Sequence, residues 1–219
     1  MQFMNIKKFT IVKIFSLLTL VGLTSACTTL TTAYTTYNKN PKYNNDEITD
    51  IQKRIVERAL QATQMSYSTM LNFDGKSFTN DCSGLLYGIF WEVGIDLIQL
   101  TSNEKGNGVK RLHTLLDKNN LLHNKKLPNV GDLVFWNNTY GRWGKNPLSH
   151  AGVIVSVDSE TGQIEYVHNN TYLGAVRKES MNLYKPHENR PTNNYMRYDN
   201  KYKKTSAELF DSFGMAWQL

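Results

Sequence analysis

The sequence predicts an α+β domain, with helices in its first half and an antiparallel sheet in its second half. Between residues 45 and 122, apolar residues recur at helical spacing in three stretches. After Pro128 the apolar residues fall instead into short β-branched or aromatic runs, which are typical of strands. The expected architecture therefore packs N-terminal helices on an antiparallel sheet.

Three helices are expected before residue 123. The first begins near Asn45, whose side chain can cap it, and the second begins at Asp81-Cys82 and ends at Gly94. The third covers residues 109–122. A fourth, short helix is expected over residues 206–213, in a polar tail that begins at residue 171.

The predicted strands are short and follow one another closely. A turn signal, Asp158-Ser159-Glu160-Thr161-Gly162, separates two of them and predicts an antiparallel hairpin. The strands cover residues 133–136, 151–157, 164–168 and 195–198.

Residues 1–26 have the features of a secretory signal peptide. Lys7 and Lys8 precede an apolar run over residues 14–23, and small residues precede Cys27. The run is shorter than the roughly 20 residues that a membrane-spanning helix needs. Small residues ending at a cysteine are similar to the lipobox of bacterial lipoproteins, which implies that Cys27 is acylated and becomes the first residue of the mature chain.

Residues 27–45 are expected to form a flexible tether between that lipid anchor and a domain over residues 46–219. The tether is rich in Thr, Asn and Tyr and shows no apolar periodicity. An edge strand is the alternative, because Thr and Tyr favour strands.

The signal peptide and the lipobox together lead us to expect an exported, monomeric protein of the cell envelope, anchored to a membrane through Cys27. In a Gram-negative host this would be the outer membrane or a periplasmic membrane face.

The charge of the chain argues against nucleic acid as a partner. The formal net charge is +6, but loss of residues 1–26 removes three lysines and no acid, leaving 22 basic against 19 acidic residues. An excess of that size is too small for a nucleic-acid surface.

A metal enzyme is not expected either, because one mature thiol and the absence of a His-Glu-x-x-His motif leave too few ligands. No cofactor is expected.

Cys82 is the candidate nucleophile. If Cys27 carries lipid, Cys82 has no disulfide partner, and a lone thiol in an oxidising compartment is expected to be buried or reactive. Most free cysteines are small buried fillers, and that interpretation stays open for Cys82 alone. Its place at a helix N-terminus favours chemistry, because the helix dipole is expected to lower the thiol pKa below the ~8.5 of a free cysteine.

His150 and His168 are the candidate base and its orienter. They lie ten residues before and eight residues after Glu160, at the centre of the predicted turn, and so at nearly opposite positions of the hairpin. His168 would then fix the ring of His150, which takes the thiol proton and later protonates the leaving amine. Two unrelated surface histidines are the alternative. The other three histidines, His113, His123 and His187, are expected to be solvated.

Three motifs in combination resemble the NlpC-type family of bacterial cell-wall peptidases, which are papain-like enzymes. The resemblance covers about residues 46–170. Its motifs are Asp81-Cys82-Ser83-Gly84, Gly131-Asp132-Leu133-Val134-Phe135 and Ser149-His150-Ala151-Gly152-Val153. By this resemblance, the roles of nucleophile, base and orienter fall on Cys82, His150 and His168, and the implied fold is papain-like.

The resemblance also implies residues that bind substrate. Asp81 and Ser83 flank the cleft in the family and contact the peptide's N-terminal side, and Tyr67 is the nearest counterpart of a tyrosine that precedes the family's cysteine. The implied substrate is the stem peptide of peptidoglycan, cleaved between D-glutamate and the diamino acid. Two alternatives stay open: an amidase that cuts the lactoyl-linked first amide, and a lipoprotein that binds wall peptides without cutting them.

Overall fold

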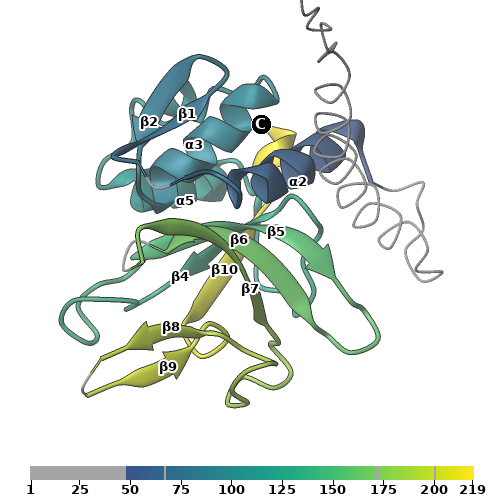
Figure 1. The fold of residues 1–219 in the computed structure, drawn as a ribbon, viewed down its shortest axis with the longest axis vertical. Helices are drawn as coiled ribbons and strands as arrows, with labels where there is room; N and C mark the ends of the chain where they lie inside the picture. Colours follow the sequence, from purple (N-terminus) through teal and green to yellow (C-terminus); the bar gives the residue numbers. More distant parts are fainter. Residues whose placement is uncertain (1–47, 67, 171–172, 200) are drawn as a thin grey trace, which may run out of the picture. The chain divides into compact units, whose positions relative to one another are not determined.

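The computed structural model describes residues 48–66, 68–170, 173–199 and 201–219. A layer of helices covers one face of an antiparallel sheet, and a small two-stranded sheet lies on the other side (Figure 1). The interpretations of residues 1–26, of the tether over residues 27–45, of Cys27 and of Tyr67 fall outside the described residues. The predicted α+β class is confirmed.

The helices begin at polar side chains that cap them. Thr49 caps the first described helix through a reciprocal capping box with Gln52, so this helix starts later than the predicted position near Asn45. The second helix starts at Cys82, as predicted, and Gly94 follows its end with φ +92°. The helical segments are α2 Asp50–Ala62, α3 Cys82–Glu92, α4 Leu97–Leu100, α5 Gly108–Lys118 and the 3-10 helix η2 Ala216–Gln218.

A hairpin that was not predicted stands before α3. Its strands are β1 Met70–Phe73 and β2 Lys76–Thr79, and the turn between them is Asp74-Gly75. Both turn residues have positive φ, 41° and 73°, which Gly and Asp tolerate better than most residues. The hairpin packs against α3 and brings the chain directly to Cys82 (Figure 1).

The main sheet has six antiparallel strands in the order β3-β10-β4-β5-β6-β7. The predicted hairpin of β5 and β6 is confirmed, with Val153 opposite Val167 and Val157 opposite Ile164. The strands are β3 Leu122–His123, β4 Leu133–Trp136, β5 His150–Val157, β6 Ile164–Asn170, β7 Ala175–Met181 and β10 Phe210–Gly214; the small sheet consists of β8 Tyr195–Tyr198 and β9 Lys203–Thr205.

Two predictions for the second half of the chain are wrong. Residues 206–213 form a turn followed by β10 rather than a helix, because β10 completes the sheet between β3 and β4. The third helix ends at Lys118 rather than at Leu122. Leu122 instead begins β3, which pairs with β10.

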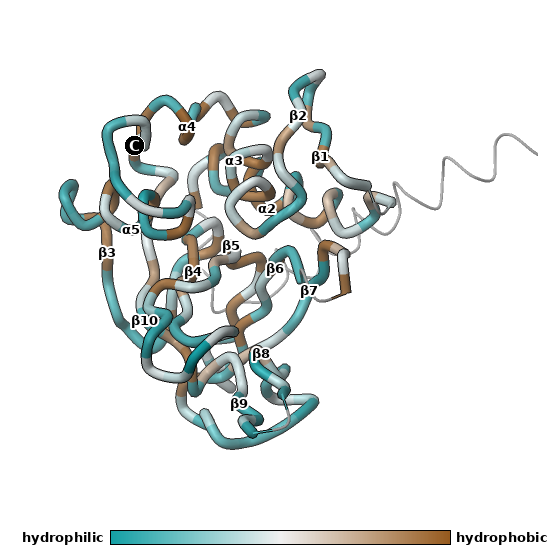
Figure 2. The backbone as a smooth tube through the Cα atoms, turned by 90° about the vertical axis from the view of Figure 1, so that its left-hand side faces the viewer, coloured by the Kyte–Doolittle hydropathy of each residue, from teal (hydrophilic) through white to brown (hydrophobic). Residues whose placement is uncertain are grey.

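The core lies between α3 and the sheet. Leu85, Leu86 and Ile89 of α3 are fully buried, and they pack with the residues of β5 and β6 that face the helices, such as Val153 and Val167. The tube in Figure 2 shows hydrophobic colour along α3 and the central strands, whereas β8 and β9 are mainly hydrophilic. Among the described residues, no helix has the length and apolarity needed to cross a membrane.

Candidate active site

Cys82 is the first residue of α3, and the helix start that holds it is built by its neighbour Asp81. The Asp81 carboxylate accepts hydrogen bonds from the Gly84 N–H at 2.8 Å and from the Ser83 hydroxyl at 2.7 Å. The Cys82 thiol accepts from the backbone N–H of Ala151, the residue after His150, and it remains partly exposed. The predicted nucleophile therefore lies against the start of β5, the strand that begins with the predicted base.

The electrostatic environment of the thiol differs from the prediction. Burial raises the pKa of the Cys82 thiol to about 11, and the negative charge of Asp81 adds to the rise, while the N–H groups of Ala151, Ser83 and Cys82 itself oppose it. The expected pKa below 8.5 is therefore wrong. The helix N-terminus alone favours a thiolate, but here the residue that caps the helix is an anion next to the sulfur.

His150 and His168 form a direct contact. His150 Nε2 lies 2.7 Å from His168 Nδ1, and the two rings are perpendicular with centroids 5.0 Å apart. Both side chains are almost completely buried. Burial, followed by the charge of His168, holds the pKa of His150 well below its ordinary value of 6.5, so this imidazole is neutral at physiological pH. The predicted proximity of the two histidines is present in the structure.

Aromatic side chains surround the histidine pair. Trp136 contacts both imidazoles, and Tyr166 packs against Trp136 and His168. Trp136 is itself fixed, because its Nε1–H donates to the Ser206 carbonyl oxygen at 2.9 Å. These contacts leave the rings little freedom to rotate, which is a requirement for a positioned base.

Gly152, in the third sequence motif, makes this packing possible. A Cβ at this position would lie 2.8 Å from the Val167 carbonyl oxygen, 3.2 Å from His168 Cβ and 3.3 Å from a ring carbon of Trp136. Any larger side chain at position 152 would therefore force the Val167 carbonyl of β6 away and crowd His168 and Trp136. The motif thus contains both the predicted base, His150, and the glycine that leaves space for His168.

Two parts of the site were not predicted. Asn169 donates to Asn80 at 2.5 Å, and Asn80 donates to the Ser68 carbonyl, so a chain of hydrogen bonds joins β6 to the loop before Cys82. Glu179 of β7 contacts His168 from the side opposite His150. Neither contact has a local signal, because Asn169 and Asn80 are 89 residues apart and the strand carrying Glu179 was not predicted.

The predicted substrate-binding residues have structural partners. Asp81 Oδ1 is used in the cap, and the Ser83 hydroxyl is bonded to it. Ser83 also touches α5, because a Cβ on Gly108 would lie 2.3 Å from the Ser83 oxygen. Substrate contact by Asp81 and Ser83 stays a prediction.

The remaining histidines are only partly as predicted. His187 is highly exposed. His123 instead contacts the buried Asp132 at 3.1 Å, and His113 lies 3.4 Å from Asp211 with its ring against Phe135. The prediction that His113 and His123 are solvated is therefore wrong, because β3, β10 and α5 enclose them. In the described part of the chain, no three His, Cys, Asp or Glu side chains gather as a metal ion requires.

The comparisons with known proteins point to one family. The family model described as NlpC/P60 family matches residues 68–199. The match includes the Cys82, His150 and His168 positions and extends beyond β6 to the strand that carries Glu179. A search of curated proteins finds no match for the chain.

Proposed function

Since the chain belongs to the NlpC/P60 family, whose members generally are cysteine peptidases acting on peptidoglycan peptides, we propose that it hydrolyses an amide bond of the stem peptide. Cys82 is the nucleophile, His150 the base and His168 the orienter in this proposal. The observation that carries it is the 2.7 Å contact between His150 Nε2 and His168 Nδ1. His150 begins β5, and the N–H of the next residue, Ala151, donates to the Cys82 thiol.

The resting state of the site has a neutral Cys82 thiol and a neutral His150 imidazole. The raised pKa of Cys82 and the lowered pKa of His150 both favour this state over a preformed ion pair. His150 therefore acts as a general base: it removes the thiol proton as the sulfur attacks the substrate carbonyl carbon. His150 Nδ1 is the nitrogen available for this step, because Nε2 is occupied by His168.

The start of α3 can stabilise the oxyanion that forms next. The Gly84 N–H is used by the Asp81 cap, whereas the N–H groups of Cys82 and Ser83 are directed toward the sulfur. Collapse of the intermediate breaks the C–N bond, and the proton on His150 passes to the leaving nitrogen. Water then attacks the thioester, with His150 again as base, and releases the acid product.

The bond between D-glutamate and the diamino acid is the specific site of cleavage that we propose, on family analogy. Cleavage of the lactoyl-linked first amide and binding of wall peptides without cleavage are the competing functions. The proposal also places the protein in the cell envelope, attached through a lipid on Cys27 after removal of residues 1–26.

Mass spectrometry of defined muropeptides tests the function directly. The mature domain should produce two fragments whose masses identify the cleaved bond, and Cys82→Ala should produce none while retaining the wild-type melting temperature. Release of an intact stem peptide from the muramoyl group would identify an amidase. Binding of the muropeptide by wild-type protein with no fragment would identify a binding protein.

A further inference from the structure

The contact on the far side of His168 extends the candidate catalytic chain by one residue. His168 uses Nδ1 for His150, and its Nε2 lies 3.2 Å from Glu179 Oε2. No polar atom of the described residues makes an aligned hydrogen bond to Nε2. The Glu179 carboxylate, 3.2 Å away, is the group that can attract a proton on this nitrogen. Both side chains are buried, at 3% and 7% exposure.

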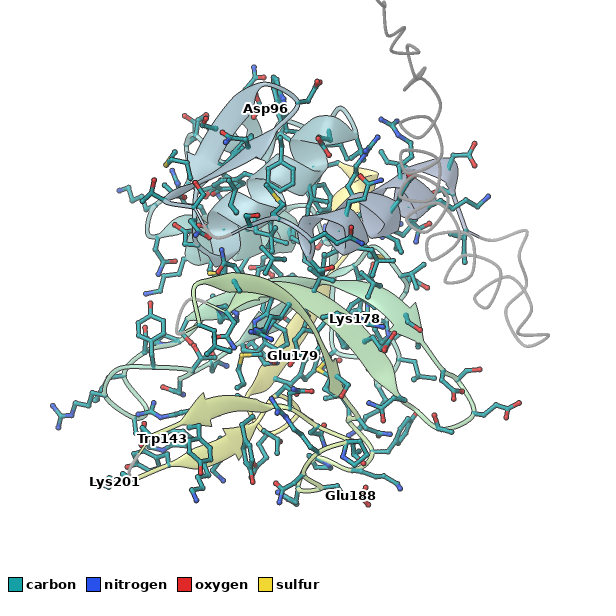
Figure 3. All side chains as sticks on the ribbon, in the orientation of Figure 1. Asp96, Trp143, Lys178, Glu179, Glu188 and Lys201 are labelled. Carbon is teal, nitrogen blue, oxygen red and sulfur yellow. The ribbon has the colours of Figure 1, made fainter. Side chains whose placement is uncertain are left out.

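The strand pairing explains this contact. Glu179 of β7 lies opposite Tyr166 of β6, two residues from His168 along the same face of the sheet. Figure 3 labels Glu179 on the side of the sheet that faces β8 and β9, away from the helices. The Tyr166 hydroxyl donates to the same oxygen, Oε2, at 3.4 Å. Glu179 is therefore held behind the histidine pair rather than in the substrate cleft.

Glu179 is ionised despite its burial. Burial by itself raises the pKa of this carboxyl group, but the contact with His168, the charge of Arg190 and the Tyr166 hydroxyl outweigh it, and the net shift is downward. An ionised carboxylate only accepts hydrogen bonds. It therefore favours a proton on His168 Nε2.

We infer that Glu179 is a positioning residue that sets the tautomers of both imidazoles, given the proposed hydrolase function. A proton on His168 Nε2 makes Nδ1 an acceptor, which then receives the Nε2–H of His150. His150 Nδ1 is left with its lone pair directed to accept the thiol proton. Glu179 takes up no proton in this arrangement; its charge stabilises the imidazolium that forms when Cys82 attacks.

Three substitutions with one control test this role. Glu179→Gln keeps the size of the side chain but can present an amide N–H to His168, which favours the wrong tautomer. Glu179→Ala removes the acceptor, and Glu179→Asp retains a carboxylate on a shorter chain. The matched control is Glu165→Gln on neighbouring β6, whose exposed carboxylate pairs with Lys178 at 2.8 Å.

The kinetic result should separate positioning from folding and from binding. Glu179→Gln and Glu179→Ala should lower kcat about 10²-fold with KM unchanged, since Glu179 contacts no substrate, and Glu179→Asp should recover part of the loss. Glu165→Gln should behave as wild type. Equal kcat in wild type and both Glu179 variants, or a loss that only follows the unfolded fraction, would overturn the inference.

Chemical rescue adds a readout that a structural role would not move. An open pocket of about 610 Å³ reaches Glu179 from solvent; its lining residues are Arg177, Lys178, Glu179, Arg190, Pro191 and Asn194. Sodium formate should therefore enter the space left in Glu179→Ala and restore part of kcat, whereas sodium chloride at equal ionic strength should not. Identical effects of the two salts would count against the inference.

A spectroscopic measurement keeps this inference separate from the proposed function. ¹⁵N imidazole shifts, assigned with His150→Gln and His168→Gln, should show protonated Nε2 and unprotonated Nδ1 for both rings in wild type, and mixed tautomers in Glu179→Ala. That pattern in a protein that cleaves no muropeptide would leave the inference standing and reject only the hydrolase. Unchanged shifts in Glu179→Ala would reject the inference even in an active enzyme.

Discussion

In two places a histidine on a strand of the main sheet contacts a buried carboxylate, and only one of these contacts belongs to the candidate active site. His168 Nε2 lies 3.2 Å from Glu179, and His123 Nε2 lies 3.1 Å from Asp132. The two histidines differ in what surrounds Nδ1, the ring nitrogen that does not face the carboxylate. His168 Nδ1 lies 2.7 Å from His150, whereas His123 Nδ1 is buried without a hydrogen-bond partner among the described residues. A buried pair takes part in catalysis only where its second nitrogen leads to a reacting group.

The carboxylates differ in the same way. Asp132 also accepts from the Asn129 N–H at 2.8 Å and from Trp217 Nε1–H at 2.8 Å, so it joins the start of β4 to β3 and to η2. Glu179 contacts His168 and accepts a hydrogen bond from the Tyr166 hydroxyl. Asp132 therefore stabilises the fold, and Glu179 supports the histidine pair.

Replacing His150 should have the largest effect on turnover. His150→Ala removes the group that accepts the thiol proton and delivers it to the leaving nitrogen, so kcat/KM for a muropeptide should fall about 10³-fold or more. In wild type, the acid limb of the pH–rate profile should lie below pH 6.5, because the lowered pKa keeps His150 neutral to more acidic pH. An acid limb above pH 7 would show that another group is the base.

Replacing His168 and His123 in parallel tests most directly whether only His168 supports turnover. His168→Ala should lower kcat about 10²-fold, the scale of a misplaced general base, and His168→Asn or His168→Gln should retain measurable activity because each keeps a hydrogen-bonding group. His123→Ala should leave kcat per folded molecule unchanged. The assignment fails if His123→Ala reduces kcat while His168→Ala matches wild type.

Replacing Asp132 should affect stability rather than chemistry. Asp132→Ala leaves the donors of His123, Asn129 and Trp217 unpaired, and the free energy of unfolding should fall by about 3 kcal/mol. Urea denaturation measures this change. Exposed Glu165→Ala is the control and should change stability by less than about 0.5 kcal/mol. A fall in kcat per folded molecule of Asp132→Ala would contradict the structural role.

Replacing Asp81 should produce the smallest change, in the thiol alone. Asp81→Asn keeps an oxygen that can cap α3 but removes the charge that raises the pKa of Cys82, so the midpoint of the alkylation rate against pH should move down from about 11. The shift should be about one pH unit. A midpoint already below 8.5 in wild type would restore the expectation drawn from the helix dipole.

Local patterns were sufficient to predict the centre of the site. The Asp81 cap places Cys82 at a helix start, and the turn after β5 brings His150 and His168 together, because both depend on residues close in sequence. The Asp74-Gly75 turn is an equally local signal that predicts β1 and β2 and was missed. These features follow from backbone preferences and turn geometry, which neighbouring residues determine.

Contacts between segments far apart in the sequence decided the strand order, the position of Glu179 and the pKa of the Cys82 thiol. β10 inserts between β3 and β4 although more than 70 residues separate it from β4, so the helical spacing of residues 206–213 gave way to sheet pairing. Glu179 reaches His168 only because β7 pairs with β6. The thiol pKa likewise depends on burial around Cys82, which exists only after the helices and the sheet pack together. Strand order and desolvation are properties of the packed chain, and no short stretch of sequence contains them.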